Sequence, residues 1–255
     1  MIKLIQNEHI KIFNKKSNRI LFLILGIICL LLALMVKNLL SSSGSDESFL
    51  DYVLFSTNFL ILMPFFLIIL AGSIVSNEFD WGTIKLLLIR PAQRSKVLLS
   101  KYITVLLIGI YILLIYLILA FIFGMLLFGF SDITGDFEIL NRLPMLYLNR
   151  LIEIEVMATL AFSISTVFRS SVFATGTAIF LVLTGRSFVE VLAHFNIEWG
   201  KYVLFANTNL SQFMNGNRPL FEGMTLPFSI TILSVYILIF LGGAWLTFCK
   251  RDVTV

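Results

Sequence analysis

The chain has 255 residues, of which 58% are hydrophobic and 13% are charged, whereas soluble domains have roughly 45 to 50% apolar and about 25% charged residues. This composition and a mean hydropathy of +0.96 argue against a soluble globular protein and indicate an integral membrane protein. Two cysteines and two histidines are too few for a disulfide framework or a metal set, so redox and metal-ion chemistry are not expected.

The first 18 residues have the pattern of an amphipathic helix. Ile2, Ile5, His9, Ile12 and Phe13 share one helical face, and the lysines of this segment lie off that face. The pattern predicts an interfacial helix that lies along the inner membrane surface.

Six apolar stretches are long enough to cross a bilayer, which takes about 20 residues in a helix. They are Ile20 to Val36, Tyr52 to Val75, Tyr102 to Phe130, Leu146 to Phe168, Ser171 to Phe195 and Leu226 to Cys249. A serine-rich segment, Lys37 to Asp51, separates the first two and is predicted to be a flexible loop. The sequence therefore predicts an all-α membrane protein, with a single transmembrane domain over residues 1–255.

The basic residues indicate the orientation of these spans. Most of the 19 lysines and arginines fall on the inner segments when the amino terminus is cytoplasmic, and cytoplasmic segments of membrane proteins carry an excess of both residues. An even number of spans then places both termini in the cytoplasm. Because the basic residues lie at helix ends, a nucleic-acid surface is not expected.

The segment 194–227, predicted to lie outside, is long for a loop and is rich in aromatic residues. Its aromatic side chains include Trp199, Tyr202, Phe205, Phe213 and Phe221. Structureless loops of this length are uncommon, and aromatic residues gather at membrane interfaces. We expect short helices that dip into the outer interface.

Motifs for enzymatic chemistry are absent from the sequence. It has no phosphate-binding loop GxxxxGK[ST], no GxSxG and no HExxH. The chain is therefore not expected to be an enzyme or to hydrolyse nucleotides itself.

The inner segment 76–101 combines turn-forming and helix-breaking residues. Gly82 permits a sharp backbone turn, Thr83 can cap a short helix, and Pro91 disfavours helical geometry in the residue before it. The pattern predicts a short helix held across the membrane surface. The alternative is a basic loop that follows the positive-inside rule, which does not account for the spacing of Glu78 and these three residues.

At this point the residues resemble a family. The segment after the second of six spans is similar to the coupling segment of permease subunits of type-2 ATP-binding-cassette (ABC) exporters. It has, in order, an acidic residue, Gly-Thr, an apolar run, and Pro with a following Arg. The likeness covers the whole chain in layout, but only residues 78–101 match as a motif. It implies that a coupling segment docks on a separate ATPase through Glu78, Gly82, Thr83, Pro91, Arg94 and Lys101. Many members have two successive acids where this chain has Asn77-Glu78.

The resemblance also implies partners and a location. Two permease copies, or one copy and a related chain, would sit on two ATPase subunits in a bacterial plasma membrane. ATP and Mg²⁺ would be bound by the ATPase, and this chain would hold no cofactor. In the family the first, second and fifth spans border the export path. The polar residues on these spans here are chiefly Ser56, Thr57 and Asn58 on the second, with Pro64 as an expected kink.

A path this apolar favours an amphipathic peptide, a hydrophobic antibiotic or a lipid-like compound. For Asn58, substrate contact and an interhelical hydrogen bond are equally open. The alternative function is a non-transporting immunity or sensor protein that binds a peptide. An ion channel would need pore-lining charges or selectivity carbonyls, which the sequence does not show.

Five charged residues lie within the fourth and fifth predicted spans: Arg150, Glu153, Glu155, Arg186 and Glu190. Counted from the inner turn at Arg169, at about 1.5 Å per residue, Glu153, Glu155 and Arg186 reach the same depth to within roughly 5 Å. Charges inside a bilayer are usually paired, so we expect an interhelical cluster. Local pairs, Arg150 with Glu153 and Arg186 with Glu190, are the alternative. A structural clamp between two helices is favoured over a substrate-binding or gating role.

Overall fold

The computed structural model describes residues 1–43, 49–83, 93–129, 137–168, 170–214 and 218–250. Within these ranges all regular secondary structure is helical. The long helices are α2 (Lys16–Ser43), α4 (Met63–Ser73), α7 (Arg94–Phe128), α8 (Phe137–Val167), α9 (Ser171–His194) and α11 (Leu226–Lys250). The all-α class predicted from the sequence is confirmed for this part of the chain.

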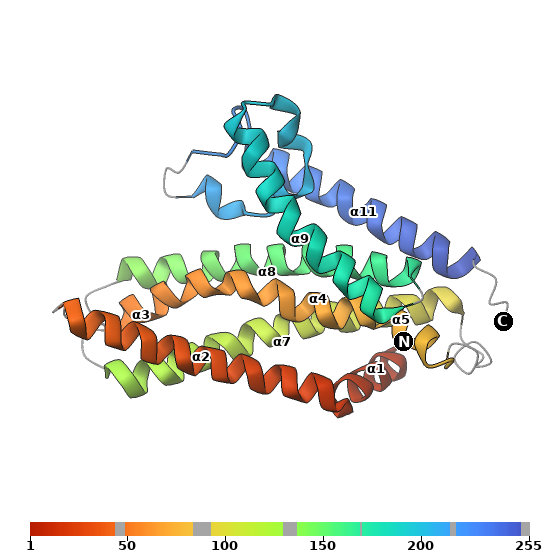
Figure 1. Ribbon diagram of the computed structural model, residues 1–255, viewed down its shortest axis with the longest axis horizontal. Helices are drawn as coiled ribbons and strands as arrows, with labels where there is room; N and C mark the ends of the chain where they lie inside the picture. Colours follow the sequence, from red (N-terminus) through yellow and green to blue (C-terminus); the bar gives the residue numbers. More distant parts are fainter. Residues whose placement is uncertain (44–48, 84–92, 130–136, 169, 215–217, 251–255) are drawn as a thin grey trace.

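Helix α8 lies in the middle of the bundle. It packs against α4, α7, α9 and α11, and Figure 1 shows α2, α4, α7 and α8 running along the long axis while α9 and α11 are inclined to it. Fully buried side chains from three of these helices, Leu67, Ile108, Ile154 and Met157, form the centre of the core. The core therefore lies around α8.

Among the residues that the structure describes, five helices are long and apolar enough to cross a membrane. They cover Lys16–Leu39, Phe49–Asp80, Arg94–Phe128, Ser171–His194 and Leu226–Lys250. The stretch predicted as the fourth span, Leu146 to Phe168, falls on α8, which is not among the five and carries four charged residues between Arg142 and Glu155. The sixth span stays a prediction.

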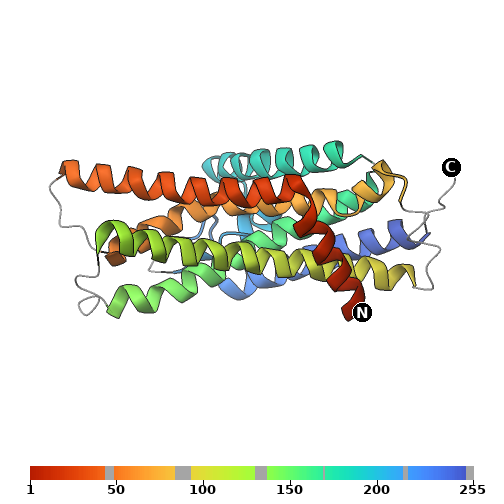
Figure 2. The same cartoon turned by 90° about the horizontal axis from the view of Figure 1, so that it is seen from below.

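The amino-terminal helix α1 (Ile2–Asn14) forms as predicted and crosses the bundle at a steep angle to α2 (Figure 2). Lys15, with φ −68° and ψ 120°, is extended and separates the two helices. Ile12 is buried against the bundle, whereas Ile2 and Phe13 remain exposed. Its exposed apolar side chains suit an interface, but its position on a membrane stays a prediction.

The second predicted span is interrupted rather than kinked at Pro64. It consists of α3 (Phe49–Ser56), the 3₁₀ segment η1 (Thr57–Leu62) and α4. Pro64 lies in the first turn of α4, where its missing N–H has no helical partner to lose. The change of helix type comes before the proline, and the Tyr116 hydroxyl donates a 2.6 Å hydrogen bond to the Ser56 carbonyl there.

Helices extend into two of the segments predicted to connect the spans. Helix α2 continues to Ser43 and α3 begins at Phe49, so most of the segment Lys37 to Asp51 is helical. In the predicted segment 76–101, α5 (Ser76–Asp80) occupies one end and the start of α7 occupies the other. Arg94 and Lys101 therefore belong to the first two turns of α7.

The segment 194–227 contains the short helices that were predicted. They are η2 (Glu198–Tyr202), α10 (Leu204–Asn207) and η3 (Leu210–Phe213). Asn207 holds this segment together, because its Nδ2 donates to the carbonyls of Lys201 and Val203 at 2.8 and 2.9 Å. Its Oδ1 accepts a 2.7 Å bond from the Ser229 hydroxyl on α11. Dipping into a membrane interface stays a prediction.

Candidate functional site

Helices from both ends of the chain meet at one end of the bundle, which we call the α1 end. Figures 1 and 2 place α1, α5, the first turns of α7 and the last turns of α11 there. The Arg94 guanidinium on α7 donates to the Cys249 carbonyl on α11 at 3.3 Å. Residues from distant parts of the sequence can therefore act together at this end.

Four charged residues form a cluster at the α1 end, which we call the Lys101 cluster: Glu8, Lys11, Glu78 and Lys101. The Lys101 side chain is 1% exposed, and its Nζ lies 2.7 Å from Glu8 Oε2 and 3.0 Å from Glu78 Oε1. The same Nζ donates to the Ile74 carbonyl at 3.2 Å. Lys11 Nζ lies 3.0 Å from a carboxylate oxygen of each acid. The cluster thus joins α1, α5 and α7 through two carboxylates and two ammonium groups.

The setting of Lys11 differs from that of Lys101, because the Lys11 side chain is 44% exposed. Partial burial alone would lower the pKa of Lys11, but the nearby carboxylates of Glu8 and Glu78 outweigh it and raise the pKa. Lys11 therefore stays charged at neutral pH and closes the open side of the cluster.

The chain leaves α5 through a turn that brings Thr83 back to Glu78. Gly82 has φ +66°, a left-handed conformation that costs glycine little because it has no Cβ. The predicted turn at Gly82 is confirmed. Thr83 Oγ1 donates to Glu78 Oε2 and also lies 3.5 Å from the Glu78 carbonyl. A helix capped by Thr83 would fall on residues 84–92. This range, which includes Pro91, lies outside the described residues.

Further hydrogen bonds attach α5 to α8 and α9. The backbone N–H groups of Val75 and Ser76, where α4 gives way to α5, donate to Ser165 Oγ on α8 at 3.2 and 3.1 Å. Asp80 Oδ2 accepts a 2.8 Å bond from the Ser171 N–H at the start of α9. A displacement of α5 would therefore disturb its contacts with α8 and α9.

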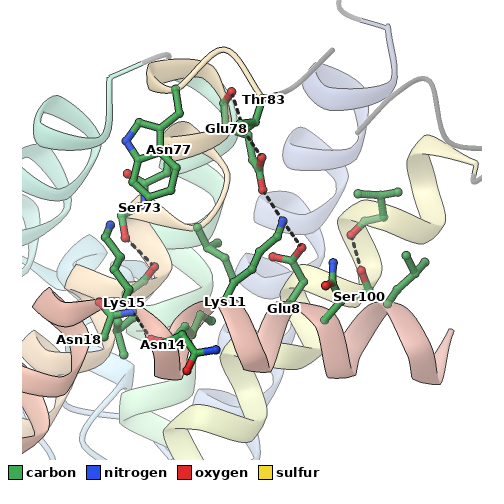
Figure 3. A pocket seen from close by; sticks show the side chains of 17 residues that line it. Glu8, Lys11, Asn14, Lys15, Asn18, Ser73, Asn77, Glu78, Thr83 and Ser100 are labelled. Carbon is green, nitrogen blue, oxygen red and sulfur yellow. Dashed lines mark hydrogen bonds and ion pairs between the residues drawn. The ribbon is translucent and has the colours of Figure 1, made fainter. Parts of the chain in front are cut away.

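A cavity of about 540 Å³ lies beside the Lys101 cluster, between α1, α4, α5 and α7. Its charged lining residues are Glu8, Lys11, Lys15 and Glu78. Figure 3 shows the contacts among Glu8, Lys11 and Glu78 in the wall of this cavity, which Lys15 also lines. The volume is within the range of about 300 to 1,000 Å³ of small-molecule sites.

Sequence reasoning placed Glu78, Thr83 and Lys101 in one functional segment, and the structure brings these three together. It missed Glu8 and Lys11, which complete the cluster from α1. Their spacing of three residues is one at which opposite charges on a helix interact, and this signal was present in the sequence. Arg94 lies apart from the cluster, on the side of α11.

A second charged cluster links α8 and α9. Arg186 on α9 forms an ion pair with Glu153 Oε1, and Arg150 lies 2.7 Å from Glu153 Oε2. The predicted interhelical pair and one predicted local pair therefore occur together, on a glutamate whose residue is 3% exposed. In the described part of the chain, Arg186 pairs with Glu153 rather than with Glu190, whose side chain is exposed.

Glu155 does not join this cluster, which corrects the prediction. Residues two apart on a helix point to different faces, so Glu155 faces α7 while Glu153 faces α9. Among the described residues, both Glu155 carboxyl oxygens are buried and have no hydrogen-bond partner. Only the absence of a side chain at Gly109 leaves room for them, because a Cβ there would collide with Oε1.

The polar residues of the second span bond to their own backbone. Ser56 and Thr57 are buried, and each hydroxyl donates at 2.7 Å to a carbonyl three residues earlier. Asn58 is exposed, and its Nδ2 donates to the Phe55 carbonyl at 3.0 Å. The interhelical hydrogen bond considered for Asn58 is not formed with the residues described, and substrate contact stays a prediction.

Within the described ranges, no group of three or more His, Cys, Asp or Glu side chains is placed to hold a metal ion.

Comparison with known proteins gives a family match and two relatives from Bacillus subtilis (strain 168). A family model described as "Protein of unknown function (DUF2705)" matches residues 23–254. The chain is 40% identical over 248 residues to the uncharacterized membrane protein YdbK, covering 96% of this chain and 100% of the relative. It is 40% identical over 216 residues to the uncharacterized protein YhcI, covering 80% of this chain and 68% of the relative. The five apolar helices agree with a membrane protein.

Proposed function

The chain belongs to the DUF2705 family of proteins of unknown function, and we propose that it is the membrane-spanning permease subunit of an ABC exporter driven by a separate ATPase. The observation that carries the proposal is the Lys101 cluster. It fastens α1, α5 and α7 together beside residues 78–101, the segment that resembles an ATPase-docking segment.

The contacts on both sides of the proposed docking segment provide a route for coupling. On one side, Thr83 is bonded to Glu78, which is paired with Lys101 on α7 and Lys11 on α1. On the other side, Arg94 is bonded to the end of α11. If an ATPase moved the chain between Thr83 and Arg94, the movement would therefore be transmitted to α1, α7 and α11 through these contacts.

The proposed topology has six spans, with α8 as the fourth, and cytoplasmic termini. Two observations support it. Helix α1 and the last turns of α11 lie at the same end of the bundle. The charges that keep α8 from being a simple apolar span include Glu153, which is buried and paired with Arg150 and Arg186, the usual arrangement for charges at membrane depth.

We propose a second copy of this chain, or a related chain, as the other half of the permease in the plasma membrane. The apolar composition of the spans favours an amphipathic peptide, a hydrophobic antibiotic or a lipid-like compound as the exported substrate. ATP and Mg²⁺ belong to the ATPase.

Co-purification with an ATPase tests the proposal. The chain is expressed with the ABC ATPase encoded nearest to it, and the complex is isolated in mild detergent and assayed for ATP hydrolysis. We expect two copies of each kind of subunit, and Glu78→Ala should lower the stimulated hydrolysis while leaving the protein in the membrane. Glu190→Ala, which removes an exposed glutamate outside both clusters, is the matched control.

Substrate transport by the purified chain without any ATPase would contradict the proposal. Absence of any ATPase partner, combined with binding of a peptide, would instead favour the non-transporting immunity or sensor protein.

A further inference from the structure

We infer that the cavity under α1 binds the headgroup of an anionic phospholipid. The inference does not depend on the proposed transport function, because it rests on the 540 Å³ cavity, the Lys101 cluster beside it and the position of α1 at the ends of the apolar helices.

The first argument is charge. Glu8 and Glu78 are matched by the ammonium groups of Lys11 and Lys101, all within 3.0 Å of a carboxylate oxygen. Lys15 also lines the cavity but has no carboxylate partner among the described residues. Three lysines against two carboxylates leave one positive charge, and it is located at Lys15.

The second argument is the position of that charge. Lys15 Nζ lies 4.9 Å from the centroid of the Trp81 ring, which also lines the cavity and is largely exposed. A cation over an aromatic face is held in place without being neutralised. Asn77 also lines the cavity. Its amide group can donate hydrogen bonds to phosphate oxygens.

The third argument separates a lipid from a soluble phosphate compound. Most of the cavity surface is apolar and includes Leu4, Ile12, Leu70, Ile74 and Val97. The polar residues Asn7, Asn14, Asn18, Ser73, Thr83 and Ser100 also line the cavity. A soluble phosphate would gain nothing from the apolar side chains, whereas the upper part of an acyl chain would bury them. The cavity also lies beneath an amphipathic helix, at the ends of apolar helices. Basic pockets between membrane helices on the cytoplasmic side characteristically bind anionic headgroups.

Tryptophan quenching by brominated lipids tests the inference, because Trp81 lies in the cavity wall. The chain has three tryptophans, so Trp199→Phe with Trp245→Phe leaves Trp81 as the only reporter. The purified protein is reconstituted in bilayers of fixed phosphatidylglycerol and phosphatidylcholine content. The acyl chains of either one lipid or the other are brominated near the headgroup. The ratio of the two quenching curves gives the preference for phosphatidylglycerol at Trp81.

We expect a severalfold preference for phosphatidylglycerol at Trp81. A protein with Trp245 as its only tryptophan, on the exposed side of α11, should show almost none. Lys15→Gln should weaken the preference by about fivefold, since one lysine near an anionic surface contributes about 1 kcal/mol. Lys16→Gln removes an equivalent charge one residue away that does not line the cavity, and it should leave the preference unchanged. If Lys15→Gln does not fold, Lys15→Arg should retain the preference.

Equal quenching of Trp81 by the two brominated lipids would overturn the inference. So would the same loss of preference in Lys15→Gln and Lys16→Gln. Glycerol 3-phosphate, which carries the phosphate without acyl chains, should not abolish the preference at millimolar concentration. Complete competition by glycerol 3-phosphate would instead assign the cavity to a soluble phosphate compound.

Discussion

Replacement of Lys101 by methionine removes the charged group with the lowest solvent exposure in the Lys101 cluster while keeping a side chain of similar length. The change leaves the carboxylates of Glu8 and Glu78, whose side chains are 7% and 11% exposed, with Lys11 as their remaining cation. Removing one partner of a buried ion pair costs about 3 to 5 kcal/mol. Because Lys11 and Thr83 still contact the acids, we expect a loss near the lower limit, about 3 kcal/mol in the free energy of unfolding.

A double variant tests whether this loss arises from uncompensated charge. Glu8→Gln combined with Lys101→Met leaves one carboxylate, Glu78, and one ammonium group, Lys11. We expect the double variant to be more stable than Lys101→Met alone, and a double-mutant cycle gives the coupling free energy. The measurement is denaturant-induced unfolding in detergent micelles, followed by circular dichroism.

Lys96→Met is the matched control, because Lys96 lies on the same helix and is exposed. It should change the free energy of unfolding by no more than about 0.5 kcal/mol. The reasoning is refuted if Lys101→Met is as stable as Lys96→Met, or if Glu8→Gln adds a further loss to it.

Three other changes test local features of the structure. Gly82→Val should destabilise the protein by about 1 to 2 kcal/mol, because an L-residue in the left-handed region carries that cost. Gly82→Asn should lose less free energy of unfolding in the same assay. Equal stability of the wild type and both variants would contradict the left-handed backbone at Gly82. Gly109→Ala should lower stability by about 1 to 3 kcal/mol, because its Cβ would meet Glu155 Oε1. Glu155→Ala should relieve that loss, and failure to do so in a double-mutant cycle would place the carboxyl elsewhere. Arg186→Ala should reduce the yield of folded protein on gel filtration. Glu153→Gln should partly restore the yield and Glu155→Gln should not, whereas equal restoration by both would contradict the ion pair.

That the apolar stretches are helical follows from the sequence for a simple physical reason. Backbone polar groups in a bilayer must be hydrogen-bonded within the segment itself, so long apolar stretches form helices whatever surrounds them. The turn at Gly82 and the pairing of Glu153 with Arg186 were also predictable. The first depends on local backbone freedom, and the second on the constant rise of a helix, which determines depth.

Only the tertiary structure shows which face of a helix meets which neighbour. Glu153 and Glu155 have nearly the same depth, yet one pairs with Arg186 and the other lies beside Gly109 without a partner among the described residues. Rotation about the helix axis is set by packing with α4, α7, α9 and α11, and no local pattern encodes it.

The Lys101 cluster depends on tertiary structure for the same reason. Lys101 is 93 residues from Glu8 and 23 from Glu78 in the sequence. Spacing along a helix reveals the local pair of Glu8 and Lys11, but the angle at which α1 crosses the bundle decides that both reach α5 and α7. That angle results from the extended backbone at Lys15 and from burial of Ile12, so these charges become a single cluster only once the helices are packed.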